Sequence, residues 1–219
     1  MTTSSDNDYV LTKSIKKGDT TISSVFNDFV ERINSEFSVN VLNVILDYLY
    51  INNFKNPRLN IIVENFDDYI KFYKSPYNFD KKIERKIKKI FEVSFDTSKV
   101  INYNKLFVIA SNFRNVAIDE AHNKISEEKL QDIAQVIDKD NIWLIRKYGS
   151  CITVFLYKEK NYSYTNKKDI LKQFTELYFP LLKKFDEFNY CKFSDLKVDF
   201  DTKENFEKNY QGNWYYYCK

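Results

Sequence analysis

Apolar residues recur three and four positions apart near the start of the chain. Between residues 23 and 37 this spacing predicts a helix that begins at Ser23 or Ser24, either of which can cap it. The same spacing between residues 39 and 50 predicts a second helix. Residues 1–20 are polar and rich in Thr, Ser, Asp and Lys, which predicts a flexible N-terminal arm.

The middle of the chain alternates between strand-like and helix-like patterns. Short apolar runs at residues 58–64 and 105–110 predict buried strands. Residues 80–92 predict a helix that carries isoleucines on one face and lysines over much of the rest. Residues 112–137 predict a helical region in which Ser126 can cap a new helix.

Two β-rich runs flank the pair Gly149-Ser150. A two-residue turn with glycine first is typical of a β-hairpin, so we predict a hairpin over residues 142–157. The pattern of the remaining chain predicts a helix, a strand, a short helix and a last strand, at residues 168–188, 196–200, 203–209 and 214–217.

Helices and strands are therefore mixed along the whole chain, and no Pro/Gly/Ser-rich linker interrupts residues 21–219. This order favours an α+β fold over a regular parallel α/β fold. We predict a single α+β domain over residues 21–219, with a mixed or antiparallel sheet that includes the 142–157 hairpin and is packed by several helices.

The scarce residue types limit the chemistry that the chain can perform. It has three glycines and one histidine, against 17 Tyr, 19 Phe and 2 Trp. Gly18, Gly149 and Gly212 are too far apart to form a phosphate-binding loop, which needs clustered glycine. His122 stands alone, although zinc sites and hydrolase triads usually need histidine. These absences disfavour several common classes of enzyme.

Charge and cysteine content indicate a cytoplasmic protein. The net charge of +3 does not favour nucleic acid as a partner. Three widely spaced cysteines do not form the even-numbered framework of a secreted protein, and the polar N-terminus lacks a secretory signal. The longest apolar region, residues 39–51, is too short and too polar to span a bilayer.

The letters Asp119-Glu120-Ala121-His122 match the metal-and-nucleotide motif of DEAH-type helicases. That motif works together with a phosphate-binding loop, which this chain lacks. His122 could instead act as a general base for a nucleophile such as Cys151. Its helical neighbours Ile118 and Asp119 instead predict a local hydrogen bond on a partly exposed face, and no nucleophile signature surrounds any candidate.

Three carboxylates near the end of the chain provide an enzymatic alternative. Asp199 and Asp201 lie two apart on a predicted strand and therefore face the same way, and Glu204 follows closely. Such a group could bind Mg²⁺ in a nuclease or phosphoryl-transfer enzyme. An exposed strand face predicts the same letters, with Asp201 or Thr202 capping the next helix, and we favour that interpretation.

The lysine-rich helix at residues 80–92 provides a second alternative, a nucleic-acid-binding surface. Its apolar face is expected to pack on the core, so its basic side chains are most simply interpreted as a solvated face.

The tail is the most distinctive stretch of the sequence. It reads Asn209-Tyr210-Gln211-Gly212-Asn213-Trp214-Tyr215-Tyr216-Tyr217 and follows Phe200-Asp201-Thr202-Lys203-Glu204-Asn205-Phe206. This last fifth of the chain resembles the ends of small bacterial cytosolic proteins of the toxin-immunity type. The resemblance implies a protein partner and brings no catalytic motif.

These observations together predict a non-enzymatic cytosolic binding protein that occludes a partner protein, as an immunity protein blocks a toxin. Exposed Tyr and Trp are effective binding anchors, and charged rims set orientation and association rate. The predicted partner-binding residues are Trp214, Tyr215 and Tyr217, with Lys86 and Lys89 as rim charges. No catalytic residue, cofactor or metal is assigned, and the metal alternative remains Asp199, Asp201 and Glu204.

Overall fold

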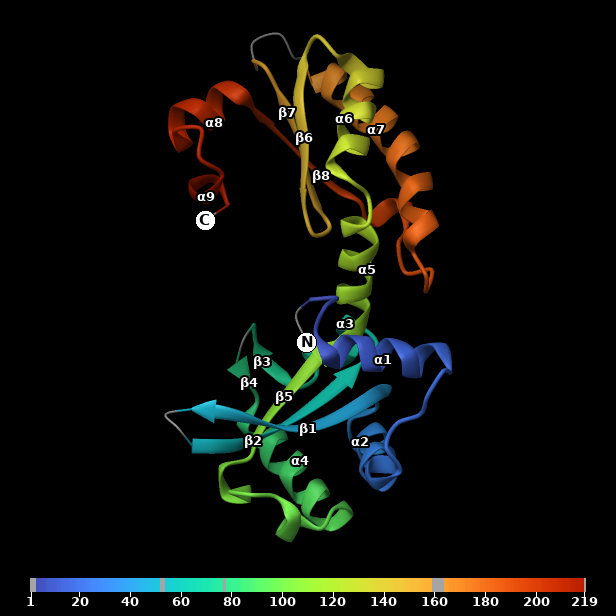
Figure 1. Cartoon of the computed structure of the whole chain (residues 1–219), viewed down its shortest axis with the longest axis vertical. Coiled ribbons are helices and arrows are strands. Elements are labelled where there is room, and N and C mark those ends of the chain that lie inside the picture. The colour runs from blue at the N-terminus through green and yellow to red at the C-terminus, as the bar shows by residue number, and fades with distance from the viewer. Residues whose placement is uncertain (1–2, 52–53, 77, 159–163, 219) are drawn as a thin grey trace. The chain divides into compact units, whose positions relative to one another are not determined.

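The computed structural model describes residues 3–51, 54–76, 78–158 and 164–218. The α+β class is confirmed, because helices and small mixed sheets alternate along the chain (Figure 1). Contacts divide the chain into two compact units, residues 1–116 and 117–219. Helix α5 (Phe113–Asn123) runs across this division, so a single domain over residues 21–219 remains a prediction. Each unit is described below by itself.

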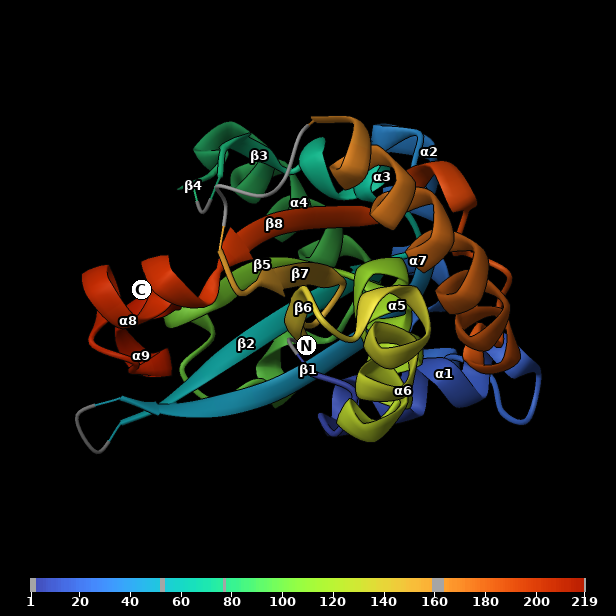
Figure 2. The same ribbon diagram turned by 90° about the horizontal axis from the view of Figure 1, so that it is seen from above.

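Unit 1 is built on a three-stranded sheet in the order β1-β2-β5. The hairpin strands β1 (Val41–Ile51) and β2 (Phe54–Val63) are antiparallel, whereas β5 (Phe107–Asn112) runs parallel to β2 (Figure 2). Its other elements are α1 (Asn7–Lys17), η1 (Ser24–Phe26), α2 (Asn27–Phe37), α3 (Phe66–Ile70), β3 (Tyr73–Ser75), β4 (Asn78–Phe79), α4 (Lys81–Ser94), η2 (Thr97–Lys99) and η3 (Tyr103–Lys105).

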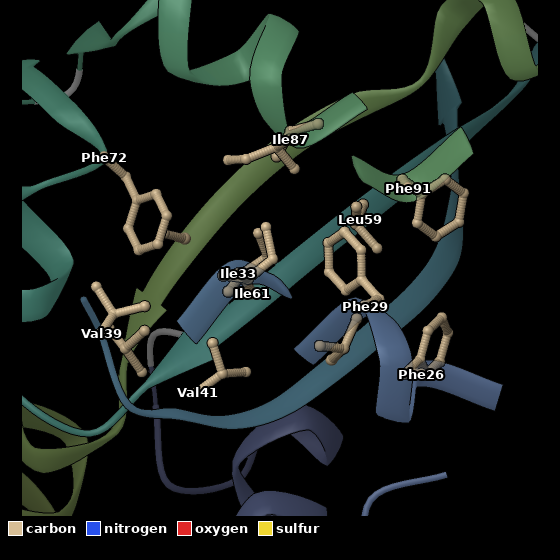
Figure 3. Close-up of a cluster of buried hydrophobic side chains, with 14 of the residues drawn as sticks. Phe26, Phe29, Ile33, Val39, Val41, Leu59, Ile61, Phe72, Ile87 and Phe91 are labelled. Carbon is tan, nitrogen blue, oxygen red and sulfur yellow. The ribbon is translucent and has the colours of Figure 1, made fainter. Parts of the chain in front are cut away.

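One face of this sheet carries the apolar core of unit 1. Side chains from α2 and α4 pack on it, and the central strand β2 supplies Leu59, Ile61 and Val63 (Figure 3). The rings of Phe29 and Phe91 meet edge to face with their centroids 5.5 Å apart. Both rings are fully buried, as expected for the centre of a core. The predicted strands at 58–64 and 105–110 and the helix at 80–92 are thereby confirmed.

The opposite face of the sheet carries several polar residues beside the buried Ile62 and is covered by α1, which lies across the sheet from α2 and α4 (Figure 1). Tyr9 of α1 is also buried and stacks on Phe113 with ring centroids 5.2 Å apart. Helix residues four apart point the same way. Thr12 Oγ1 accepts a hydrogen bond from Asn43 Nδ2 at 3.1 Å. Asp8 Oδ2 accepts one from Asn60 Nδ2 at 2.9 Å. We call this contact, completed by the 2.7 Å ion pair of Lys16 with Glu64, the polar seam.

Two expectations for unit 1 change accordingly. Residues 39–50, expected as a helix, form β1 instead. Asn43 and Asp47 are four residues apart, as in a helix, but they also lie on one face of the strand. On that face Asn43 hydrogen-bonds to Thr12 of α1, and Asp47 accepts a hydrogen bond from Arg58 of β2. Most of the arm expected over residues 1–20 is a helix, because its polar side chains find partners across the sheet.

Unit 2 has a second three-stranded sheet, in the order β6-β7-β8. The predicted hairpin is confirmed: β6 (Ile142–Tyr148) and β7 (Cys151–Leu156) are antiparallel around Gly149, whose φ is 56°. Strand β8 (Lys197–Thr202) runs parallel to β7. The helical elements are α6 (Glu127–Asp138), α7 (Tyr164–Phe185), η5 (Phe193–Asp195), α8 (Lys203–Tyr210) and α9 (Trp214–Tyr217).

Both faces of this second sheet are covered by apolar side chains. Helices α6 and α7 pack on one face over Ile145, Ile152 and Val154, while α8 and α9 lie on the other side (Figure 1). Ser126 caps α6 as predicted, since its Oγ accepts a hydrogen bond from Lys129 N at 3.3 Å. No helix within the described residues is both long and apolar enough to cross a membrane.

Candidate functional site

The distinctive tail folds into an aromatic cluster on the outer face of the unit 2 sheet. Phe206 of α8 and Trp214 of α9 stack with ring centroids 4.1 Å apart. Trp214 also meets the edge of Phe155, a β7 residue that is 1 % exposed, at 5.4 Å. We call the cluster the aromatic cap; it consists of Trp143, Phe155, Phe206, Trp214 and Tyr217.

Two cations lie over the indole rings of the cap. The guanidinium carbon of Arg146 is 3.9 Å from the centroid of a Trp214 ring, and Lys203 Nζ is 5.4 Å from Trp143. A cation over an indole face is worth about 0.5–2 kcal/mol, depending on its exposure to solvent. Arg146, on β6, therefore packs against Trp214 and holds the first residue of α9 in place.

The end of α9 is tied to β8 by a hydrogen bond. Tyr217 Oη donates to Asp201 Oδ2 at 2.7 Å, and burial together with this carboxylate raises the pKa of Tyr217. Asp201 also accepts from the side-chain amide of Asn205 at 2.8 Å and 3.0 Å. The phenol thus stays protonated at neutral pH and holds the last turn in place.

Trp214 and Tyr217 point inward, so the two residues between them point to solvent. Tyr215 is 65 % exposed and Tyr216 is 49 % exposed, and their rings lie 5.7 Å apart. The backbone before them is set by Asn213, whose Oδ1 accepts from Tyr215 N at 2.9 Å. Unit 2 therefore exposes two adjacent tyrosines on a short helix that Trp214 and Tyr217 hold against the sheet.

The predicted strand at 214–217 is wrong, because these residues form α9. A strand would have placed alternate residues together, whereas a helix places Trp214 and Tyr217, three apart, on one side. Of the predicted anchors, only Tyr215 is exposed; Trp214 and Tyr217 are half-buried in the cap. Sequence reasoning did not select Tyr216, although the Asn213 cap was a usable signal for a helix.

The predicted rim charges lie in unit 1, on α4, and not in the unit that holds the cap. Lys86 pairs with Glu36 at 2.6 Å, and Lys89 is exposed. Glu84 neutralises two further lysines of this helix, Lys81 and Lys88, each at 2.9 Å. The nucleic-acid alternative for residues 80–92 stays a prediction, because Lys82, Arg85 and Lys89 of the same helix are exposed.

The metal alternative at Asp199, Asp201 and Glu204 gains no support from the geometry. Asp201 is used by Tyr217 and Asn205, and Thr202 caps α8 by accepting from Asn205 N at 3.0 Å. Val198 and Phe200, which alternate with these aspartates along β8, pack on the core. Within the described part of the chain, no three His, Cys, Asp or Glu side chains are grouped to hold a metal.

His122 lies in the interior and is 3 % exposed, so the partly exposed position expected from the sequence is wrong. Its Nδ1 is 2.7 Å from the buried Tyr178 hydroxyl, and burial lowers its pKa to about 4. His122 and Cys151 both line a small hollow of about 160 Å³. Since the ring nitrogen facing Tyr178 is already used, the arrangement is that of a structural histidine.

Asp119, from the helicase-like letters, also has a structural contact. Its Oδ1 accepts from Ser150 N at 2.9 Å, which supports the hairpin turn. A Cβ on Gly149 would come within 2.8 Å of the same oxygen, so glycine suits this turn by its positive φ and a larger residue would displace the Asp119 carboxylate.

Comparisons with protein-family models, curated proteins and solved structures find no match to this chain.

Proposed function

We propose that the protein is a non-enzymatic binding protein that occludes a partner protein, as an immunity protein blocks a toxin. The observation that carries this proposal is the pair Tyr215 and Tyr216, exposed on a helix whose other side is fixed in the aromatic cap. Tyrosine combines a large apolar ring with a polar tip and few rotatable bonds, which suits it to protein recognition.

Preorganisation supports this function. Binding loses free energy when it must order loops and side chains, by about 0.5–1.5 kcal/mol for each immobilised side chain. Here the stacking of Trp214 and the Tyr217–Asp201 hydrogen bond order α9 before any partner arrives. More of the contact energy of the exposed tyrosines is then retained as affinity.

Charged side chains of both signs lie on the neighbouring helix α8. Lys203, Glu204, Glu207 and Lys208 line an open hollow of about 570 Å³ together with Tyr157. Mixed charges beside aromatic anchors set the orientation and the association rate of a partner more than its final affinity. They suit a protein surface with complementary charges of both signs.

The proposal is tested with the product of the gene encoded next to this chain, the natural candidate for a toxin. We expect purified protein to bind it and to block its toxic activity in a stoichiometric assay. Replacing both tyrosines, Tyr215→Ser with Tyr216→Ser, should weaken binding at least about 100-fold in calorimetry, because central aromatic anchors are worth about 2 kcal/mol or more each.

Tyr148→Ser is the matched control, since Tyr148 is 83 % exposed in the same unit but lies at the hairpin turn. It should leave affinity unchanged. A double variant that binds as tightly as the wild-type protein contradicts the assignment of the surface. Substrate turnover by the purified chain, abolished by a single polar substitution in a pocket, contradicts the non-enzymatic function itself.

A further inference from the structure

The two three-stranded sheets of the described chain have four outer edges, and three of these edges are protected. In unit 1, Tyr73 Oη donates to the backbone oxygen of Ala110 in β5 at 3.1 Å. In unit 2, Gln131 Nε2 of α6 donates to the backbone oxygen of Ile145 in β6 at 3.4 Å. The other edge strand of unit 2, β8, is six residues long and carries the charged side chains Lys197, Asp199 and Asp201. Caps, charges and short strands keep a sheet edge from pairing with another chain.

The fourth edge strand, β1, lacks such protection over most of its length within the described residues. It is eleven residues long, and nine of them are Val, Leu, Ile or Tyr. Its single charge, Asp47, is held by Arg58 of the neighbouring strand. Figure 2 shows β1 at the border of the sheet, with β2 between it and β5. A long, apolar and uncapped edge strand is the kind that pairs with a further strand.

The backbone of β1 shows which groups are available for such pairing. Val44 N donates to Asn43 Oδ1 at 2.8 Å, so this N–H group points away from β2. Because the direction alternates along a strand, Leu46, Tyr48 and Tyr50 also point their N–H and C=O groups away from β2. None of these outward groups has a partner in the part of the chain that the structure describes.

The end of the β1–β2 hairpin also lacks a third strand. Strand β5 begins at Phe107, which pairs with Arg58, and Arg58 in turn pairs with Asp47. Beyond Asp47 the ribbon therefore consists of β1 and β2 alone. Its β2 side is closed, since Asn102 Nδ2 donates to the backbone oxygen of Lys55 at 2.9 Å. A two-stranded ribbon has little stability in water by itself, so a strand added on the β1 side would stabilise it.

We infer that a second copy of the chain pairs with this edge, and that the two copies of β1 run antiparallel about a two-fold axis at Tyr48. In this register Tyr48 pairs with its own copy and Leu46 pairs with Tyr50, so the outward backbone groups of all three residues are bonded. Asp47 lies opposite Leu49, so no like charges meet across the interface. Cross-strand pairs of aromatic and aliphatic side chains add to its stability.

The character of the edge favours a copy of the chain as the occupant. Interfaces between identical subunits are more apolar than those between different proteins. Since Asp47 is already held by Arg58, β1 has no available charge that would select a foreign strand. Two-fold pairing also ends by itself, because the far edge of each sheet is capped at Ala110. The result is a closed dimer with one continuous sheet, and its interface is independent of the proposed partner-binding surface on α9.

Sedimentation velocity of the full chain at a series of concentrations tests this inference. We expect a reversible equilibrium between monomer and dimer. Tyr50→Pro removes an outward N–H group and should weaken the dimer at least about tenfold, because the facing C=O group loses its partner. Tyr50→Ala is the matched control, since it removes the same exposed ring but keeps the N–H group, and it should weaken the dimer much less.

A disulfide tests the register. In a bonded antiparallel pair the two Cα atoms are about 5.5 Å apart, a distance that a disulfide spans. Tyr48→Cys, in a chain that also carries Cys151→Ser and Cys218→Ser, should therefore form a covalent dimer when diamide oxidises its thiols. Tyr148→Cys in the same background is the matched control, because Tyr148 is exposed on the hairpin of unit 2, and it should remain a monomer on a denaturing gel.

A wild-type chain that sediments as a monomer at every concentration would overturn the inference. Equal effects of Tyr50→Pro and Tyr50→Ala, or a Tyr48→Cys chain that does not cross-link, would overturn it as well. A dimer that is lost in the Tyr215/Tyr216 double variant would place the interface on α9 instead. Should Tyr50→Pro fail to fold by circular dichroism, the Tyr48→Cys cross-link decides the question alone.

Discussion

The two units contain three-stranded sheets of the same topology, but they cover the second face of the sheet with different kinds of side chain. In each, a hairpin is followed by a helical crossover and a third strand that runs parallel to the second, giving the orders β1-β2-β5 and β6-β7-β8. In each, helices cover one face with a purely apolar core. The second face is covered by the polar seam in unit 1 and by the aromatic cap in unit 2.

This difference teaches what each cover contributes to stability. A hydrogen bond that replaces contacts with water contributes about 0.5–1.5 kcal/mol net. A buried aromatic side chain contributes several kcal/mol, judged by the cost of removing it. Helix α1 turns Val10 and Leu11 outward, 55 % and 47 % exposed, and its inward contacts are Tyr9 on Phe113 together with the hydrogen bonds of Asp8 and Thr12. We therefore expect the seam to be the weaker and more salt-sensitive cover.

The largest expected effect is the loss of Phe155, which joins the cap to the sheet. Phe155→Ala should lower the free energy of unfolding by about 3–5 kcal/mol, because it leaves a cavity between Phe206 and Trp214. Urea unfolding followed by tryptophan fluorescence measures this directly, since Trp143 and Trp214 both lie in unit 2. Tyr148→Ala, which removes an exposed ring, should cost little. If Phe155→Ala and Tyr148→Ala lower the free energy of unfolding by similarly small amounts, the aromatic cap does not stabilise unit 2.

The next effect depends on pH and concerns unit 2, which contains the one histidine of the chain. Burial lowers the pKa of His122 from 6.5 to about 4. The unfolded chain therefore takes up a proton first, and stability that is complete above pH 6.5 is lost as the pH falls towards 4. The linked loss amounts to about 3 kcal/mol at most.

His122→Gln keeps a polar group beside Tyr178 but cannot titrate. Its urea midpoint should change less than that of the wild-type protein between pH 6.5 and pH 4.5. Parallel pH profiles for the two proteins would assign the loss to other groups.

A smaller effect tests the seam itself. Asn60 is fully buried; it donates to Asp8 and accepts from Ser111 Oγ at 2.9 Å. Asn60→Leu leaves these partners unsatisfied and should cost about 1–3 kcal/mol. Hydrogen exchange read by mass spectrometry should show faster exchange throughout α1 and unchanged exchange in α9. Lys17→Ala, at the exposed end of α1, serves as the control. Unchanged exchange in α1 would mean that the seam does not hold it.

The smallest effect concerns the ion pair of the seam. Lys16 and Glu64 retain 28 % and 16 % of their side-chain exposure. Lys16→Gln should therefore cost less than about 1 kcal/mol. In the same exchange experiment, 1 M NaCl should speed exchange of wild-type α1 and have a smaller effect on the variant. Equal salt responses would remove this pair from the seam.

The sequence predicts best where structure is set by neighbours along the chain. Gly149-Ser150 specifies the hairpin locally, and Ser126 and Thr202 cap helices within one turn. Strand β1 was missed because the partners of Asn43 and Asp47 lie on α1 and β2. Tertiary contacts of this kind override local periodicity.

The candidate site shows the same limit. An aromatic run at the C-terminus was correctly singled out, but which rings face inward depended on α9 being a helix. Phe155 and Arg146 lie far from Trp214 along the chain, and no pattern within the tail indicates that they receive it.

The parallel third strand has a consequence for how the chain is made. Hairpin β1–β2 can close within a short stretch, but the free edge of β2 waits for β5, which is separated from it by the whole segment from Val63 to Phe107. At synthesis rates of 5–20 residues per second, that edge stays unpaired for roughly two to nine seconds. An unpaired strand edge can pair with a strand of another chain. During synthesis of each unit there is therefore an interval in which a chaperone or a second nascent chain can bind the free edge of its second strand.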